Sequence, residues 1–312
     1  MARWKAREFE NWLLFLSIPV LTGILPNKYL TLWHMFAQAV YLLSQITIHV
    51  SHVNQADILI KKFLLKCQEY YGESCMTFNM HLLYHLAHHV ARWGPLWASS
   101  AYCFESCIGF LKSMIRSQQG IPHQVIRALS WKNVIKFLEP VVSPKARHYV
   151  KSLPQKQPQG NLGGGCILYG KPKLFSPTPE ERWLCEREGL NIDACEVYTK
   201  IMKNGCIFTE PEISIRTDNS VALLNSKRVV VIHKIIYARD GDLLFLLASD
   251  VHTEPILVIP DLDASDHLMR KIIVVEEEKQ ILSSEELKVV CFRASFDHGQ
   301  FVAPLPNVYN VC

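Results

Sequence analysis

Glu105 has the surroundings in this sequence that most suggest chemistry. It stands in "YCFESCIGFLKSMIR", residues 102–116, among aromatic and sulfur-containing residues at helical spacing. At ~100° per residue, Lys112 and Arg116 return to within about 20° of the direction of Glu105. Gly109 shares this face and would let a backbone or ligand approach closely. One carboxylate above two cations suits phosphodiester chemistry, in which carboxylates hold Mg²⁺ and cations hold the nucleic-acid strands. From the pattern alone, an ordinary solvated amphipathic helix is the simpler interpretation.

Histidines are concentrated upstream of this segment. The stretch "HLLYHLAHH" places His81, His85 and His88 on one helical face, because offsets of four and seven residues return near the starting direction. Histidines four residues apart can bind zinc, but the sequence has neither an HExxH glutamate nor a CxxC pair. We favour a histidine-rich polar face, packed on neighbouring helices or near phosphates, over a zinc site.

Composition and charge limit the classes of protein to which this chain can belong. A chain of 312 residues with 49% hydrophobic and 20% charged residues is globular and long enough for two domains. Residues 1–150 contain 15 Lys and Arg against 7 Asp and Glu, whereas the remainder contains 18 against 22. The basic half suggests a polyanion partner, and the acidic half argues against DNA as its own main ligand. Residues 11–25 form the longest apolar run, which is shorter than the ~20 residues of a membrane span, so we expect a buried amphipathic helix.

Periodicity divides the chain into helices followed by strands. The sequence predicts an α+β protein with an all-helical domain over residues 1–150. A Pro-, Gly- and Gln-rich linker is expected over 151–180 and a short helical segment over 181–205. β-branched runs separated by turn residues predict a small antiparallel barrel-like domain over 206–312.

Three stretches resemble CACTA-type (En/Spm) DNA transposases, in the order that the family has them. "WKAREFENWLLFLSIPVLTGILPNKYLTLWHMFAQAVYLL" is similar to the helical segment that follows the family's catalytic core. "MTFNMHLLYHLAHHVARWGPLWASSAYCFESCIGFLKSMIR" resembles the next domain, of formally unknown function, with its histidine-leucine helix, its "GP" break and its "FE…G.LK…R" helix. "SFDHGQFVAPLPNVY" resembles the C-terminal end. The likeness is strongest over residues 75–116.

This resemblance implies roles for the residues singled out above. The family is similar to RNase-H-like enzymes that cut and join DNA with two aspartates and a glutamate around two Mg²⁺ ions. Glu105 matches the third acidic residue, while Lys112, Arg116 and the histidines 81, 85 and 88 become candidates for contacts to the DNA backbone. The acids before Glu105 are Glu8, Glu10, Asp57, Glu69 and Glu73, and none of them ends a hydrophobic strand as the two aspartates would. We therefore expect Mg²⁺ binding only in a complete enzyme, with no cofactor and no strand cleavage for this chain alone.

The resulting interpretation is a nuclear, transposase-derived protein, either a truncated copy or a co-opted one, that binds DNA weakly and without sequence preference. A full-length transposase or other nuclear proteins are possible partners. One alternative is a non-catalytic nuclear interaction protein. Another is a membrane-associated protein anchored by residues 11–25.

Overall fold

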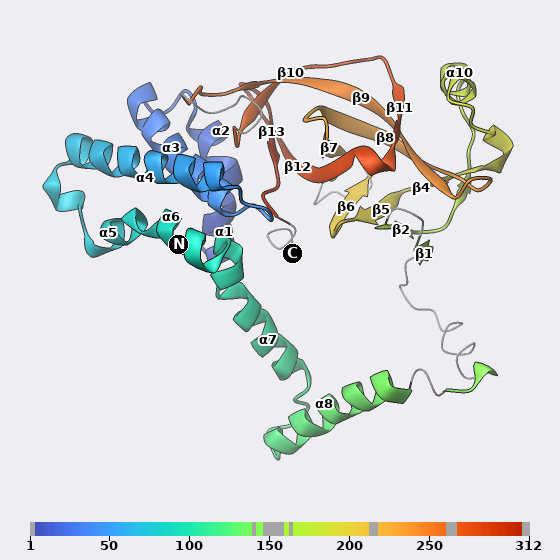
Figure 1. Ribbon diagram of the computed structural model, residues 1–312, viewed down its shortest axis with the longest axis horizontal. Helices are drawn as coiled ribbons and strands as arrows, with labels where there is room; N and C mark the ends of the chain where they lie inside the picture. Colours follow the sequence, from blue (N-terminus) through green and yellow to red (C-terminus); the bar gives the residue numbers. More distant parts are fainter. Residues whose placement is uncertain are drawn as a thin grey trace. The chain divides into compact units, whose positions relative to one another are not determined.

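The structure, a computed structural model, describes residues 4–138, 142–145, 159–161, 165–211, 218–259 and 267–307 (Figure 1). It divides into two compact units. Residues Met1–Trp97 and Pro158–Cys312 form the first unit, and Ala98–Gln157 form the second. The boundary between Gln157 and Pro158 lies near the change in composition, but the first unit includes residues from both sides of it.

The first unit begins with helices, drawn from blue to cyan in Figure 1. They are α1 (Ala6–Asn11), a π-helical turn η1 (Trp12–Leu16), α2 (Ser17–Leu21), α3 (Asn27–Leu43), α4 (Val50–Tyr71), the turn η2 (Glu73–Cys75), α5 (Phe78–Tyr84) and α6 (Leu86–Trp93). Helices α4 and α6 each end at a glycine, because Gly72 and Gly94 adopt positive φ angles of 82° and 90° that side chains disfavour. Among the described residues, no helix has the length and apolar character needed to cross a membrane.

The second unit contains two further helices and is described by itself. Helix α7 spans Tyr102–Ser113 and α8 spans Ile121–Leu138. A glutamine fixes the connection between them, since the side chain of Gln124 accepts the backbone N–H of Arg116 at 2.7 Å and donates to the carbonyl of Gln119 at 2.7 Å.

The remainder of the first unit is mainly antiparallel sheet. Its elements are β1 (Gln159–Asn161), β2 (Cys166–Tyr169), β3 (Lys173–Leu174), α10 (Pro179–Arg187), the turn η5 (Ile192–Ala194), β4 (Cys195–Tyr198), β5 (Lys200–Lys203), β6 (Cys206–Thr209), β7 (Val221–Leu224), β8 (Val229–Ala238), β9 (Leu243–Pro255), β10 (Arg270–Val275), β11 (Gln280–Ser283), the turn η7 (Ser284–Glu286), β12 (Leu287–Phe296) and β13 (Gly299–Pro304). One sheet has the order β1-β2-β5-β6, and the other has the order β11-β9-β10-β13-β12-β7-β8-β4-β3 with a further pairing of β8 to β9. Helices followed by antiparallel sheets confirm the α+β class.

Two expectations for the middle of the chain need correction. The stretch 151–180, expected to be irregular, includes the strands β1, β2 and β3. The expected helical segment 181–205 is helical only at its start, because α10 ends at Arg187 and is followed by β4 and β5. Strand pairing accounts for β4 and β5. Val197 of β4 lies opposite Ile236 of β8, and Ile201 of β5 lies opposite Leu168 of β2. Partners distant in sequence thus override a local helical pattern.

Glu181 is an acidic residue buried where α10 meets the sheet. Its carboxylate accepts hydrogen bonds from Lys234 at 2.7 Å and from Lys279 at 3.4 Å, with the side chain only 2% exposed. It also closes a capping box with Thr178 at the start of α10. Desolvation acts to raise the pKa of Glu181, but the hydrogen bonds from Lys234 and Thr178 and the charges of Lys234 and Lys279 outweigh it, so this pKa is lowered.

The N-terminal helices share one of the hydrophobic clusters of the first unit with part of the large sheet, and the other buried clusters lie mainly among the strands. Phe15 of η1 lies against Phe292 of β12 with ring centroids 5.2 Å apart. Phe301 of β13 belongs to the same cluster as the buried leucines of α3 and α4. A hydrogen bond also joins the helices to a distant segment of the chain: the backbone N–H of Leu268 donates to the side-chain oxygen of Gln38 at 2.7 Å.

His34 is a buried polar side chain in this contact. Neither of its ring nitrogens has a hydrogen-bond partner in the described part of the chain, and its side chain is fully buried. His267, also buried, accepts the backbone N–H of Ile259 at 3.0 Å through Nε2. Desolvation, with a smaller contribution from the charge of His267, lowers the pKa of His34 to about 4.

We predict that this histidine makes the fold sensitive to acid. The folded pKa of His34 lies below its unfolded value of 6.5, so the unfolded chain binds more protons between these values. The contribution of neutral His34 to the free energy of unfolding is complete above pH 6.5 and falls by about 3 kcal/mol by pH 4. Urea unfolding of the wild type and His34→Leu at pH 7 and pH 4 measures it: the variant should lose less stability on acidification. The exposed His88→Asn serves as control and should behave as wild type; equal acid loss in all three proteins contradicts the prediction.

Candidate functional site

The histidines expected on one helical face lie on two helices instead. The segment is interrupted at His85, which separates α5 from α6 with φ −91° and ψ −1°. His81 and His85 still meet, with their Nε2 atoms 3.3 Å apart and their rings edge to face. Both side chains are exposed, as is His88. The single helix expected for these imidazoles is therefore interrupted at His85, and all three side chains are exposed.

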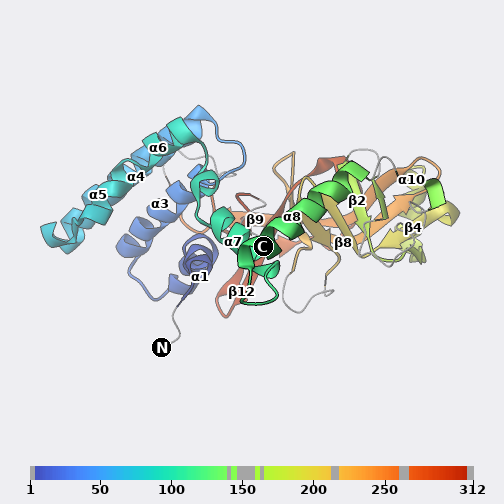
Figure 2. The ribbon, with the colours of Figure 1, turned by 90° about the horizontal axis from the view of Figure 1, so that it is seen from below.

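A polar groove lies between α4 and the histidine segment, and Figure 2 shows α5 and α6 running alongside α4. His85 and His88 line it together with Asp57 and Lys61 of α4, around a volume of about 480 Å³. The ammonium of Lys61 donates to Asp57 at 2.6 Å, and this hydrogen bond raises the pKa of Lys61. Imidazole and ammonium N–H groups can bind a phosphate oxygen, while Asp57 offsets part of the positive charge.

His81 faces a different hollow from His85 and His88. It lines a neighbouring groove of about 480 Å³ with Lys61, Met80 and Tyr84. The three histidines therefore do not converge on one point. Within the described parts of the chain, no three His, Cys, Asp or Glu side chains are grouped so as to hold a metal ion.

Glu105 lies in the first turn of α7, in the second unit. Its side chain is exposed, and no described cation forms an ion pair with it. Lys112 is on the last turn of the same helix and is also exposed. Arg116 lies beyond the helix end at Ser113, so the helical face expected to include all three residues stops at Lys112.

The apolar side of α7 is largely open. Phe104 and Ile108 are 68% and 52% exposed. A Cβ placed on Gly109 would meet no atom within 4 Å, so no packing within the described structure requires a glycine there. That Glu105 holds Mg²⁺ together with two aspartates of a complete enzyme stays a prediction.

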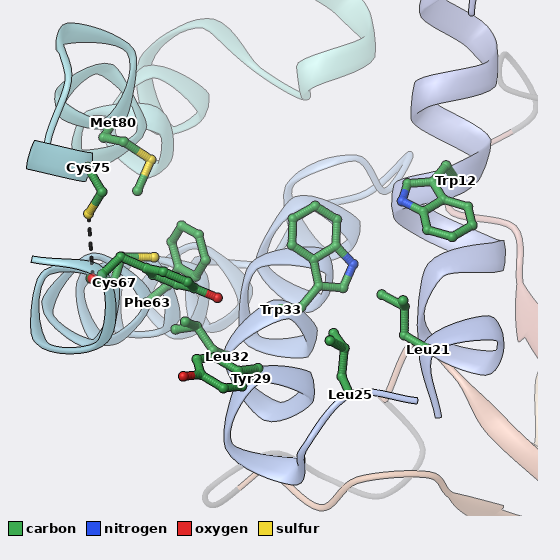
Figure 3. A pocket seen from close by; sticks show the side chains of 11 residues that line it. Trp12, Leu21, Leu25, Tyr29, Leu32, Trp33, Phe63, Cys67, Cys75 and Met80 are labelled. Carbon is green, nitrogen blue, oxygen red and sulfur yellow. Dashed lines mark hydrogen bonds between the residues drawn. The ribbon is translucent and has the colours of Figure 1, made fainter. Parts of the chain in front are cut away.

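An apolar pocket was not foreseen from the sequence. It has a volume of about 400 Å³ and is lined by side chains of η1, α2 to α5 and neighbouring turns (Figure 3), namely Trp12, Leu21, Leu25, Tyr29, Leu32, Trp33, Phe63, Cys67, Tyr71, Cys75 and Met80. The thiol of Cys75 donates to the carbonyl of Cys67 at 3.5 Å. Burial, and to a lesser extent the neighbouring Cys75, raises the pKa of Cys67 to about 11. Such a thiol is a poor nucleophile at neutral pH, so Cys67 does not supply this pocket with a reactive thiolate.

We predict that Glu105→Gln leaves the stability of the chain almost unchanged. An exposed carboxylate without an ion pair among the described residues contributes little to folding, so the change in free energy of unfolding should stay below about 0.5 kcal/mol. Thermal melts of both proteins measure this. A loss of ~1–3 kcal/mol would instead assign Glu105 a structural role with charged hydrogen bonds.

Comparisons with known protein families, with curated proteins and with solved structures find no match for this chain. The resemblance to CACTA-type transposases accordingly depends on the motif residues alone. What these residues can do has to be inferred from their chemistry and surroundings.

Proposed function

We propose that this chain is a transposase-derived nuclear protein that binds DNA weakly, without sequence preference, and does not cut it alone. The observation that supports this most is the distribution of charge around the candidate residues. Between residues 74 and 138 the chain has six Lys and Arg and five His, and Glu105 is its single acid. Such a stretch attracts the phosphate backbone of nucleic acids through charge, without reading the bases.

The exposure of the candidate side chains is consistent with this proposal. His81, His85 and His88 are open to solvent, as are Lys112 and Arg116 in the other unit. Backbone-directed binding needs accessible N–H donors and places few demands on their exact arrangement. An interrupted histidine helix and an arginine beyond the end of α7 are compatible with it.

Cleavage of DNA would need carboxylates in addition to Glu105, supplied by a complete enzyme. Two-metal phosphodiester chemistry needs several carboxylates around the ions, and Glu105 could contribute one of them in a complete enzyme. A full-length transposase or another nuclear protein is therefore a reasonable partner. The barrel-like form of the β-rich part is a further inference, supported by the pairings β9–β10–β13–β12–β7–β8 and by the return of β8 to β9.

We predict salt-sensitive DNA binding. Fluorescence anisotropy with a labelled 20-base-pair duplex should show affinity falling about ten-fold or more between 50 and 200 mM NaCl, because bound lysines and arginines release counterions. Lys112→Glu with Arg116→Glu should weaken binding at low salt, and two duplexes of unrelated sequence should bind equally well.

A matched control is the pair Lys171→Glu and Lys271→Glu, which changes the charge equally at exposed positions outside residues 74–138. This pair should bind DNA nearly as wild type does. Salt-independent binding, no binding at low salt, or equal loss in both charge-reversal pairs would contradict the proposal.

A second candidate function is a non-catalytic protein interaction, and the surface of α8 favours it. Ile126, Trp131 and Phe137 are 63%, 58% and 80% exposed within the second unit. Several large apolar side chains exposed on one helix can mark an interaction site. If α8 serves this role, Trp131→Ser with Phe137→Ser should reduce self-association or capture of a partner in light scattering and pull-down experiments, with DNA binding unchanged. Loss of DNA binding without loss of association would contradict this second function.

A further inference from the structure

A groove in the first unit lies outside every residue discussed as a DNA contact. Its volume is about 510 Å³. Its lining joins the connection between α3 and α4 to turns and strand ends of the sheet, and comprises Tyr41, Gln45, Ile46, Thr47, His49, His52, Asn204, Cys206, Leu223, Lys227, Lys288, Val289, Pro304, Leu305 and Pro306. It is thus formed only where helices and strands meet.

Hydrogen bonds fix the two walls of this groove to each other. The backbone N–H of Ile46 donates to the carbonyl of Pro306 at 3.2 Å, and the side chain of Asn307 donates to the carbonyl of Ser44 at 2.7 Å. The indole of Trp97 donates to the carbonyl of Gln45 at 3.3 Å. Because these bonds restrain the connection, a ligand would find the groove largely preformed, and binding would cost little ordering of the backbone.

The polar side chains of the groove favour an anion. Lys227 and Lys288 are exposed at its sheet wall, and His49 and His52 stand at its helical wall with ring centroids 5.3 Å apart. Among the described residues, the lining includes no Asp or Glu. The β-rich part of the chain has more acids than bases, so this concentration of basic groups is a local exception.

The start of α4 adds to the same preference. His49 is the residue before the helix, and it makes no side-chain cap. The first turn of this 22-residue helix contains no acid that would offset the positive end of the helix dipole. At this helix start the backbone N–H groups of His52 and Val53 donate to the carbonyl of His49, and those of Val50 and Ser51 have no acceptor among the described residues. Such N–H groups at a helix start bind anions readily. Two lysines, two imidazoles and a helix start therefore favour negative charge at one place.

We propose that this groove binds a phosphate group, through Lys227 and Lys288 on one side and His49, His52 and the start of α4 on the other. Phosphate matches the donors because its tetrahedral oxygens accept from several directions at once. The phosphate can belong to a nucleic-acid backbone or to a small phosphorylated molecule. The site does not depend on the function proposed above, since none of its residues lies within residues 74–138.

The first experiment uses inorganic phosphate as the probe and the full chain. Titration followed by two-dimensional NMR of the imidazoles should move the His49 and His52 resonances saturably. The resonances of His252, which is exposed and lies outside both this groove and residues 74–138, should stay unchanged. Lys227→Gln with Lys288→Gln should weaken this binding ten-fold or more. Lys288→Gln alone serves as a milder variant in case the double variant is poorly folded, and should weaken it by at least a factor of three.

The matched control is Lys171→Gln with Lys271→Gln, which removes the same charge from exposed positions outside the groove. It should bind phosphate as wild type does. The proposal is overturned if the His49 and His52 resonances do not respond, if the Lys288→Gln variant binds as wild type does, or if the control pair loses as much affinity as the groove pair.

The source of the phosphate is then decided by comparing a nucleoside monophosphate with a 20-base-pair duplex on the same variants. A duplex affinity reduced by the groove variants identifies a nucleic-acid backbone, and a reduction for the mononucleotide alone identifies a small phosphorylated ligand. Failure of this site is distinguishable from failure of the DNA-binding proposal, because the latter is tested at Lys112 and Arg116. Groove variants that leave both ligands unaffected would refute the phosphate site only.

Discussion

The first unit depends on one apolar contact, in which the N-terminal helices cover the end of the large sheet. Phe15 lies against Phe292, while Phe301 and Ala303 are almost completely buried beside residues of α3 and α4. Burial of each large side chain contributes roughly 1.5–3 kcal/mol, so either part alone would expose surface that destabilises it. The helices and the C-terminal strands therefore fold as one body, although some 200 residues of sequence separate them.

This contact also positions the surfaces with functional interest. Helix α4 packs on α3, and α5 and α6 lie along α4, so the exposed histidines are held indirectly by the same core (Figure 2). The connection between α3 and α4 is restrained more directly, through Asn307 and Pro306 beyond the last strand. Side chains on rigid elements keep their geometry without a ligand, and this is what a preformed binding site requires. Helices α7 and α8 belong to the other unit and do not share that support.

Local signals in the sequence predict many of the helices and strands, but they do not predict which distant segments contact each other. Gly72 and Gly94 end their helices, and such ends can be read from the sequence because positive φ at a helix end is a local preference of glycine. The stretch from Asp193 to Gly205 has helical spacing, yet β4 and β5 form there because their partners lie in β8 and β2. His34 and Gln38 show the same limit at the level of side chains. Both lie on the buried face of α3, and no pattern within the helix announces that a distant segment covers them.

The two glutamates of most interest show why burial decides what an acidic residue can do. Glu181 is buried and its oxygens are occupied by Lys234 and Lys279, so its lowered pKa reflects a structural ion pair. A carboxylate in that state has no oxygen to offer a metal ion without giving up a lysine. Glu105 is in the opposite state, exposed and without an ion pair in the described part of the chain. It contributes little to the fold, and for that reason its oxygens are open to a metal ion or a partner. No contact within the described residues calls for a carboxylate at position 105, so a requirement for one would come from a metal ion or a partner.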